Sequence, residues 1–166
     1  MDISVGRDDL TVLIFELEGH RYGLHAADIR EVTRAAAPTR LAQAPRIVEG
    51  LINLRGEVAV VIDLRARFGL PLRRLSPSDV FLVCRIRTRL VALRVDAVLA
   101  LQQVDAGALV PAPEVTDGAL HLSGVLTLAD GLIFLGDLPS FLSQAESDAL
   151  AEAVSQAERG GGDVSP

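Results

Sequence analysis

Lysine and tryptophan are both absent from this chain of 166 residues, and aromatic residues make up only 4% of it. A hydrophobic core must therefore be built from Leu, Val, Ile and Ala, which are plentiful because hydrophobic residues account for 49% of the sequence. Charged residues account for a further 23%. This balance is that of an ordinary globular domain, and it excludes intrinsic disorder over most of the length and a collagen-like or low-complexity chain.

Cysteines and long apolar runs are scarce as well. The single cysteine, Cys84, cannot form an internal disulfide, which fits a reducing compartment. The longest purely apolar runs contain about five residues, whereas a membrane-spanning helix needs about 20. The N-terminal residues are acidic in part and include no apolar stretch of signal-peptide length. These absences predict a cytoplasmic protein without direct membrane insertion.

Charge is distributed unevenly along the chain. Residues 7–94 hold 15 Arg and 10 acidic residues, whereas residues 95–166 hold one Arg and 11 acidic residues. The net charge of −6 and the lack of Lys argue against a nucleic-acid-binding footprint, which requires a clustered excess of basic residues. The asymmetry favours a protein that presents differently charged surfaces to protein partners.

Short segments that alternate apolar and polar residues predict a mainly β fold over the first 136 residues. A short helix is predicted at residues 64–68, after Asp63, and a helical pattern begins after Asp137. Both aspartates are predicted to cap these helices, and Ser143 and Glu146 have the spacing of a capping box. The apolar stripe of the C-terminal helix is predicted to comprise Leu138, Phe141, Leu142, Ala145, Ala149, Ala153 and Ala157.

The sequence also contains an internal repeat. Shifting the chain by 74 positions places residues 50–64 over residues 124–138 without a gap, with matching glycines and matching Asp-Leu pairs. Two unrelated hairpins that precede helices would look partly alike, but we favour a duplication. Because a unit of this size is marginally stable alone, two small β-barrels should share a core. We predict one domain over residues 8–158, made of barrel halves 8–75 and 76–136 and a helix at 137–158, with a disordered tail at 159–166.

Residues that could support catalysis or metal binding are few. His20, His25 and His121 lack the spacing of a zinc site, and no CxxC or HExxH motif is present. The nucleophile-elbow, P-loop and dinucleotide-binding motifs are also missing. Cys84 lies in an apolar strand and is interpreted as a core residue. The sequence therefore predicts no catalytic residue, no metal site and no cofactor.

The presence of an arginine at position 55 is not explained by the needs of the predicted hairpin turn. Arg55 stands at the reversal between two predicted strands, and its counterpart in the repeat is Ala129, so the turn does not require a guanidinium group. Arg55 either forms a structural ion pair with an acidic residue such as Glu31 or Asp63, or presents its planar fork to a protein partner. The two roles can overlap.

Residues 48–65, VEGLINLRGEVAVVIDLR, resemble the motif of the CheW family, which couples receptors to kinases in bacterial chemosensory arrays. Other segments resemble further family landmarks in the same order, upstream of this motif at residues 22–24 and 29–32 and downstream at residues 95–98, 111–114 and 122–124. The resemblance extends over about residues 10–143, which is nearly the whole globular part.

This resemblance implies a pair of fused five-stranded, SH3-like barrels followed by a C-terminal helical segment, without catalysis or cofactor. It also implies an adaptor that joins the cytoplasmic tips of methyl-accepting chemoreceptors to the regulatory domain of a CheA-type histidine kinase. Because that domain shares the fold, contacts run from barrel to barrel and can build rings that include other CheW-like domains. The resemblance assigns partner binding to Ile29, Glu31, Gly50, Asn53, Leu54, Arg55, Gly56, Val80 and Leu101.

The sequence departs from the family pattern at two places. Ala59 and Val60 stand where the family often has proline, and Ala92 stands where it often has glycine. These departures leave open whether the chain serves flagellar chemotaxis or a related system that controls pili, gliding or another output. A double-barrel nucleic-acid-binding protein is the less favoured alternative, because the isoelectric point is near 5.0.

Overall fold

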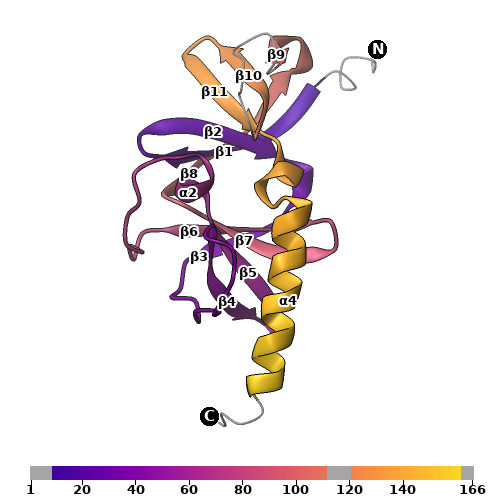
Figure 1. The fold of residues 1–166 in the computed structure, drawn as a ribbon. Helices are drawn as coiled ribbons and strands as arrows, with labels where there is room; N and C mark the ends of the chain where they lie inside the picture. Colours follow the sequence, from indigo (N-terminus) through magenta and orange to yellow (C-terminus); the bar gives the residue numbers. More distant parts are fainter. Residues whose placement is uncertain (1–8, 112–120, 162–166) are drawn as a thin grey trace.

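The computed structural model describes residues 9–111 and 121–161, which form two β-sheets and a long C-terminal helix (Figure 1). A six-stranded sheet has the order β8-β1-β2-β11-β10-β9, and a five-stranded sheet has the order β3-β6-β7-β5-β4. The predicted mainly β fold is confirmed, and the two sheets are consistent with a pair of SH3-like barrels. The six-stranded sheet has one strand more than expected, because the short β9 adds to its edge.

The strands of the six-stranded sheet are β1 (Asp9–Leu17), β2 (His20–His25), β8 (Ala97–Asp105), β9 (Leu109–Pro111), β10 (Leu122–Leu128) and β11 (Gly131–Gly136). Those of the five-stranded sheet are β3 (Ile29–Arg34), β4 (Val48–Leu54), β5 (Glu57–Asp63), β6 (Val80–Ile86) and β7 (Arg89–Val95). The helical elements are η1 (Ala26–Asp28), α2 (Leu64–Arg67), η2 (Ala106–Ala108), η3 (Leu138–Phe141) and α4 (Gln144–Gly161).

The predicted duplication is visible in the strand register. In the β4–β5 hairpin, Gly50 pairs with Val61, and in the β10–β11 hairpin, Gly124 pairs with Leu135, so both pairs differ by 74 positions. Both hairpins have a bulge immediately before that glycine. The β6–β7 hairpin likewise repeats the register of β1–β2 at a shift of 69 positions. The two repeats therefore have the same internal structure.

The predicted division into barrel halves 8–75 and 76–136 is wrong, because each sheet contains strands from both repeats. β5 pairs in parallel with β7 of the second repeat, and β11 pairs in parallel with β2 of the first. β3 and β8 are exchanged in the same way, since β3 pairs with β6 and β8 with β1. Strand patterns indicate which face of a strand is buried but not which strand lies beside it. Residue 75 therefore lies near a boundary between repeats, not between barrels.

The shared core that the duplication predicts is present. The largest apolar cluster includes Phe15 and Leu24 of the six-stranded sheet together with Ile62, Leu82 and Leu93 of the five-stranded sheet. Each sheet also has a smaller cluster of its own. The two sheets consequently pack as one unit and hold their outer surfaces at a fixed separation.

The two matched glycines have a common physical role. A Cβ atom at Gly50 would overlap the carbonyl oxygen of Thr39, and a Cβ atom at Gly124 would overlap the carbonyl oxygen of Val110. Gly50 also has a φ of +151°, which strains any residue with a side chain. Each glycine thus lets a neighbouring backbone segment approach its hairpin closely.

We expect Gly50→Ala and Gly124→Ala each to lower the free energy of unfolding by about 2 kcal/mol or more, because backbone atoms cannot move aside as a flexible side chain can. Urea unfolding followed by circular dichroism measures the change. Gly107→Ala is the matched control, since a Cβ atom there meets only the Asp105 carboxylate at 3.4 Å. Equal stability of all three variants would contradict this role of the glycines.

Helix α4 packs on the main core through Leu150, with Val154 beside it, and Ala153 is also buried. The predicted stripe is therefore wrong in part, because Ala145, Ala149 and Ala157 are exposed. The predicted helix at 137–158 divides into η3 and α4, and α4 continues to Gly161, so the predicted disordered tail begins too early. Its remaining residues lie outside the described part of the chain. Asp63 caps α2 through Arg65 N as predicted, whereas Asp137 makes no cap.

The start of α4 is held by charge as well as by packing. Arg67 of α2 donates two hydrogen bonds of 2.7 Å to the Glu146 carboxylate and a third, of 3.2 Å, to the carbonyl of Phe141. The predicted capping box is confirmed, because Ser143 N donates to Glu146 and Glu146 N donates to Ser143 Oγ. The Arg67 hydrogen bonds lower the pKa of Glu146 to about 2. Glu146 thus joins the helix to α2 as a carboxylate.

Glu146→Gln should destabilise the protein at neutral pH, and the difference from the wild type should shrink as the pH falls. The unfolded carboxyl has a pKa of about 4.3, and the folded one is lower, so its stabilising effect is complete above about pH 5. That effect is lost as the pH falls towards 2, where the folded state also binds the proton. Urea unfolding at several pH values measures it, with Glu152→Gln on the exposed face of α4 as the control. A difference that does not depend on pH would contradict the assignment.

Candidate protein-binding site

The β4–β5 turn is shaped by its own sequence. Arg55 and Gly56 form a two-residue loop in which φ is +52° and +90°, respectively, as a type I′ hairpin requires. Gly56 adopts this conformation without steric cost, and its N–H donates a hydrogen bond of 2.7 Å to Asn53 Oδ1. Asn53 and Gly56 therefore set the turn, and Arg55 occupies its most exposed position. We call residues 53–57 the hairpin tip.

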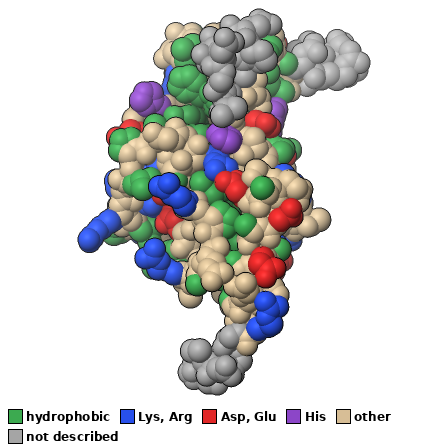
Figure 2. Space-filling view, in the orientation of Figure 1, with side chains coloured by type: hydrophobic (Ala, Val, Ile, Leu, Met, Phe, Trp, Pro, Cys, Tyr) green, Lys and Arg blue, Asp and Glu red, His purple; other side chains and the backbone are tan. Residues whose placement is uncertain are grey.

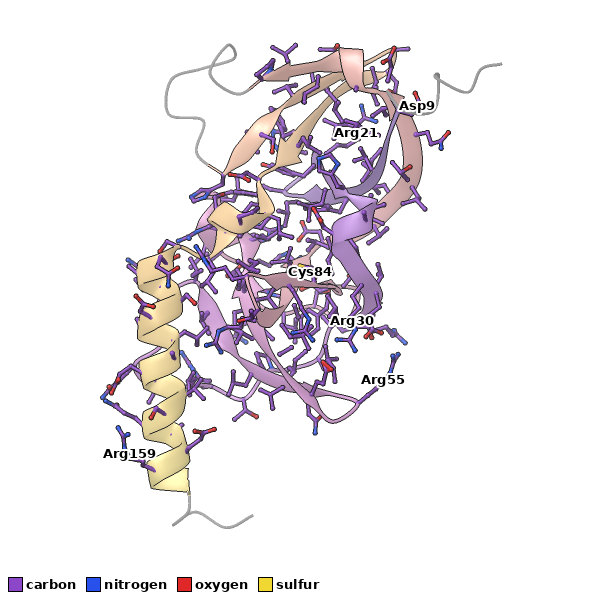
Figure 3. The ribbon with its side chains drawn as sticks, turned by 90° about the vertical axis from the view of Figure 1, so that its right-hand side faces the viewer. Asp9, Arg21, Arg30, Arg55, Cys84 and Arg159 are labelled. Atoms are coloured by element: carbon purple, nitrogen blue, oxygen red, sulfur yellow. The ribbon has the colours of Figure 1, made fainter. Side chains whose placement is uncertain are left out.

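Ion pairs fasten the hairpin tip to β3. Arg55 Nη2 lies 3.0 Å from Glu31 Oε1, and Arg30 Nη1 lies 2.9 Å from Glu57 Oε1. Arg30 and Glu31 belong to one edge strand of the five-stranded sheet, and the tip belongs to the other edge, so these pairs help to close the barrel. Figure 3 shows Arg30 and Arg55 at the same end of the molecule. The Arg30 hydrogen bond lowers the pKa of Glu57, which keeps the carboxylate ionised.

Arg55 forms the ion pair that the sequence suggested, and it also has the exposure that contact with a partner would need. Of its two suggested acidic partners it pairs with Glu31, whereas Asp63 lies 3.6 Å from Arg94 instead. Its side chain nevertheless remains 82% exposed, so most of the guanidinium faces solvent. The ion pair orients Arg55 without burying it, which leaves its donors available to another molecule.

Exposed apolar residues accompany these charges. Val58, directly opposite Asn53 in the hairpin, is 63% exposed, and Val32 beside Glu31 on β3 is also exposed. A surface with a central arginine and exposed aliphatic side chains suits a protein partner better than a small molecule. We therefore identify the hairpin tip with the adjacent β3 residues as a candidate protein-binding site.

The structure brings together five of the nine sequence-predicted binding residues, namely Glu31, Asn53, Leu54, Arg55 and Gly56. Leu54 packs on the small apolar cluster beneath the hairpin, and Gly50 is buried against Thr39. Ile29 and Val80 are half-buried against the main core. Leu101, which is 66% exposed on β8, belongs to the other sheet. The nine residues thus do not form one continuous cluster.

Sequence reasoning missed Arg30 and Glu57, which belong to this site, and Val58 and Arg85, which lie beside it. Arg85 on β6 adds a second guanidinium 3.6 Å from Glu57. The sequence does contain one signal for these ion pairs. Arg30 and Glu31 carry adjacent opposite charges, and Glu57 follows the turn directly, so each could have been expected to pair with an opposite charge on another strand. Their pairing depends on the closure of the barrel, which local patterns do not show.

The cysteine and a histidine that could have been reactive are instead packed into the fold. Cys84 is buried in β6, and desolvation raises the pKa of its thiol to about 12, so it remains an unreactive thiol at neutral pH. His121 hydrogen-bonds to Ser140 Oγ at 3.0 Å and lies beside Phe141. In residues 9–111 and 121–161, no group of three or more His, Cys, Asp or Glu side chains is placed to hold a metal ion. Nor is any helix in these two ranges long and apolar enough to cross a membrane.

A buried ion network fixes the two sheets relative to each other. Arg65 of α2, whose side chain is only 6% exposed, pairs with Glu18 in the β1–β2 turn and with Asp96 after β7, the latter at 2.6 Å. Asp96 also accepts a hydrogen bond from Arg73, which binds the buried Asp79 in turn. The candidate site is therefore carried by a rigid two-barrel body.

Comparisons with known proteins agree with this architecture. Residues 11–146 match the family model described as a CheW-like domain. The chain is 32% identical over 146 residues to the chemotaxis protein CheW of Klebsiella aerogenes, which covers 87% of each chain. It is 28% identical over 121 residues to Protein FrzA of Myxococcus xanthus, with 72% of this chain and 76% of that protein covered.

A solved structure is similar as well. The scaffolding protein TtCheW from Thermoanaerobacter tengcongensis matches with a TM-score of 0.75 at 30% sequence identity. The match covers 81% of this chain and 92% of that chain. The resemblance found in residues 48–65 thus extends to the whole fold.

Two arginine variants should separate the exposed ion pair from the buried network. Arg55→Ala should change the free energy of unfolding by less than about 1 kcal/mol, because exposed pairs contribute little. Arg65→Ala should cost more, about 2–3 kcal/mol, because it removes the hydrogen bonds of a buried guanidinium to the half-buried Asp96, which keeps Arg73 as a partner. Urea unfolding of both variants measures the difference. A large loss for Arg55→Ala would mean that its role is mainly structural.

Proposed function

This chain belongs to the CheW family of chemotaxis coupling proteins, and we propose that it joins the cytoplasmic tips of methyl-accepting chemoreceptors to the regulatory domain of a CheA-type histidine kinase. Family membership gives it a non-catalytic role in chemosensory signalling. The observation that carries the proposal is the exposed Arg55, which the Glu31 ion pair holds in one orientation on a rigid hairpin. A side chain fixed before binding loses less conformational entropy when a partner docks.

The proposal assigns different roles to different parts of the surface. The hairpin tip and β3 form one docking surface, on which Arg55 is the central contact. Val80 on β6 and Leu101 on β8, together with Ile29 at the start of β3, contribute to a second surface, along which the receptor tip binds. Gly50, Asn53 and Gly56 act indirectly, because they shape the hairpin that carries Arg55. Two weak surfaces that are engaged together in an array bind strongly.

The same reasoning extends to location and assembly. We place the protein in the cytoplasm, recruited to receptor arrays at the membrane, where other CheW-like domains complete rings with it. The similarity to Protein FrzA supports an alternative in which the same adaptor chemistry serves a system other than flagellar chemotaxis. The identity of the receptor that binds distinguishes the two.

Replacing Arg55 by Glu should weaken binding to the receptor tip or to the kinase regulatory domain by about tenfold or more, equivalent to ~1.4 kcal/mol. The reversed charge both removes the guanidinium and repels Glu31. Isothermal titration calorimetry with a receptor fragment and a regulatory domain from the same organism measures both affinities. Arg159→Glu, which reverses an exposed charge at the end of α4, should leave both affinities unchanged.

A double variant separates contact from positioning. Glu31→Arg combined with Arg55→Glu restores an ion pair within the protein but presents the opposite charge to a partner. If Arg55 touches the partner, binding remains weak in the double variant. Recovered binding would show that Arg55 only orders the hairpin, and normal binding of Arg55→Glu to both partners would remove it from the interface.

A further inference from the structure

A cavity of about 1150 Å³ opens beside α2, away from the hairpin tip. Its walls come from residues 38–49, which precede and begin β4, from residues 66–72 around the end of α2, and from Glu146 of α4. No residue of the hairpin tip lines it. A space of this size exceeds most sites for small molecules and suits a segment of a peptide chain.

Each carboxylate in the cavity wall lies close to an arginine of the protein. Glu49 accepts a hydrogen bond of 2.7 Å from Arg94 Nε, and Asp63 lies 3.6 Å from the same guanidinium. Glu146 receives both hydrogen bonds from Arg67. Each of these three acidic groups therefore has an arginine partner within the protein, and Arg94 is shared between Glu49, Asp63 and Asp79.

Two arginines in the same wall have no such partner. Arg40 and Arg46 line the cavity and are exposed, and within the described part of the chain neither forms an ion pair. On the face shown in Figure 2, basic side chains gather to the left of α4, whereas acidic side chains follow the helix itself. Arg40 and Arg46 thus offer two guanidinium groups at the cavity wall to a ligand with carboxylates.

The loop that carries Arg40 and Arg46 is ordered before any partner binds. Thr39 exchanges two backbone hydrogen bonds of 2.8 Å with Leu51 of β4, and Val48 N donates to the carbonyl of Pro45. Prolines at positions 38 and 45 restrict the backbone at both ends of this segment. The loop therefore loses little conformational entropy when a partner binds to it.

Apolar side chains complete the surface. Leu41 and Leu70 are half-buried on the main core and form part of the wall. Leu72 also lines the cavity and is 68% exposed, so a partner could cover it. A ligand that matches this wall must combine carboxylates, for the two arginines, with aliphatic side chains, for the leucines.

We infer that this cavity binds an acidic, amphipathic peptide segment of a protein partner, through Arg40, Arg46 and the apolar wall. It is a docking surface separate from the hairpin tip, so the inference does not depend on the role proposed for Arg55. The carboxylates of the segment pair with the two guanidinium groups at the cavity entrance, where bidentate hydrogen bonds are available. Its leucine-like side chains cover Leu41, Leu70 and Leu72.

The test uses the full chain labelled with ¹⁵N and titrated with a short synthetic peptide of Glu and Leu residues. We expect saturable shifts of amide resonances confined to residues 38–49 and 66–72. The double variant Arg40→Glu/Arg46→Glu should reduce the affinity by more than tenfold while its remaining spectrum stays that of the wild type. Arg34→Glu/Arg74→Glu, which reverses two other exposed arginines that form no ion pair with the residues the structure describes, should bind as the wild type does.

Three further results would overturn the inference. A peptide with Gln in place of Glu that binds equally well would exclude recognition of carboxylates. Inorganic phosphate that produces the same shifts would show a site for simple anions instead. Shifts that move to the hairpin tip would mean that the peptide binds the other surface. A failed Arg55→Glu experiment changes none of these outcomes, so the two proposals can fail separately.

Discussion

The last strand of each repeat pairs in parallel with a strand from the first hairpin of the other repeat, and the rest of the architecture follows from these two pairings. β5 completes its sheet only beside β7, and β11 only beside β2. Neither repeat can therefore form a barrel from its own strands. The main apolar core and the Arg65 network then bind the two sheets into one body. Because a docking surface on such a body does not move relative to the rest, weak contacts on separate barrels can act together.

Local features of this protein were predictable from its sequence, whereas long-range pairings were not. Arg55 with Gly56 and Ser143 with Glu146 act over a few residues, so their patterns indicated a turn and a capping box that the structure contains. The exchange of strands and the Arg30–Glu57 pair depend on which edges meet in space. α4 shows the same limit, because Leu150 is buried and Ala149 exposed once the helix docks at its actual angle. The family resemblance supplied the fold where local patterns were insufficient.

The two repeats have kept their geometry but diverged in charge. By the shared register, the positions of Arg30, Arg55 and Glu57 in the five-stranded sheet correspond to Leu99, Ala129 and Gly131 in the other. Residues 29–95, which span the five-stranded sheet, contain 13 of the 16 arginines and only five acidic residues. The charge asymmetry seen between the two halves of the sequence is thus sharper between the barrels. The ion pairs that link the two edges of the five-stranded sheet thus have no counterpart at the equivalent positions of the other sheet, where Leu99, Ala129 and Gly131 stand.

The interleaved repeats also have an evolutionary consequence. In a domain-swapped homodimer, two identical chains complete each other by exchanging an element. The two repeats of this chain complete each other in the same way. Joining such copies end to end preserves every strand pairing while placing the two copies under separate selection. A symmetric ancestor would have offered its neighbours two identical ends. The fused chain has two ends that differ, so it can be polar, with a defined head and tail.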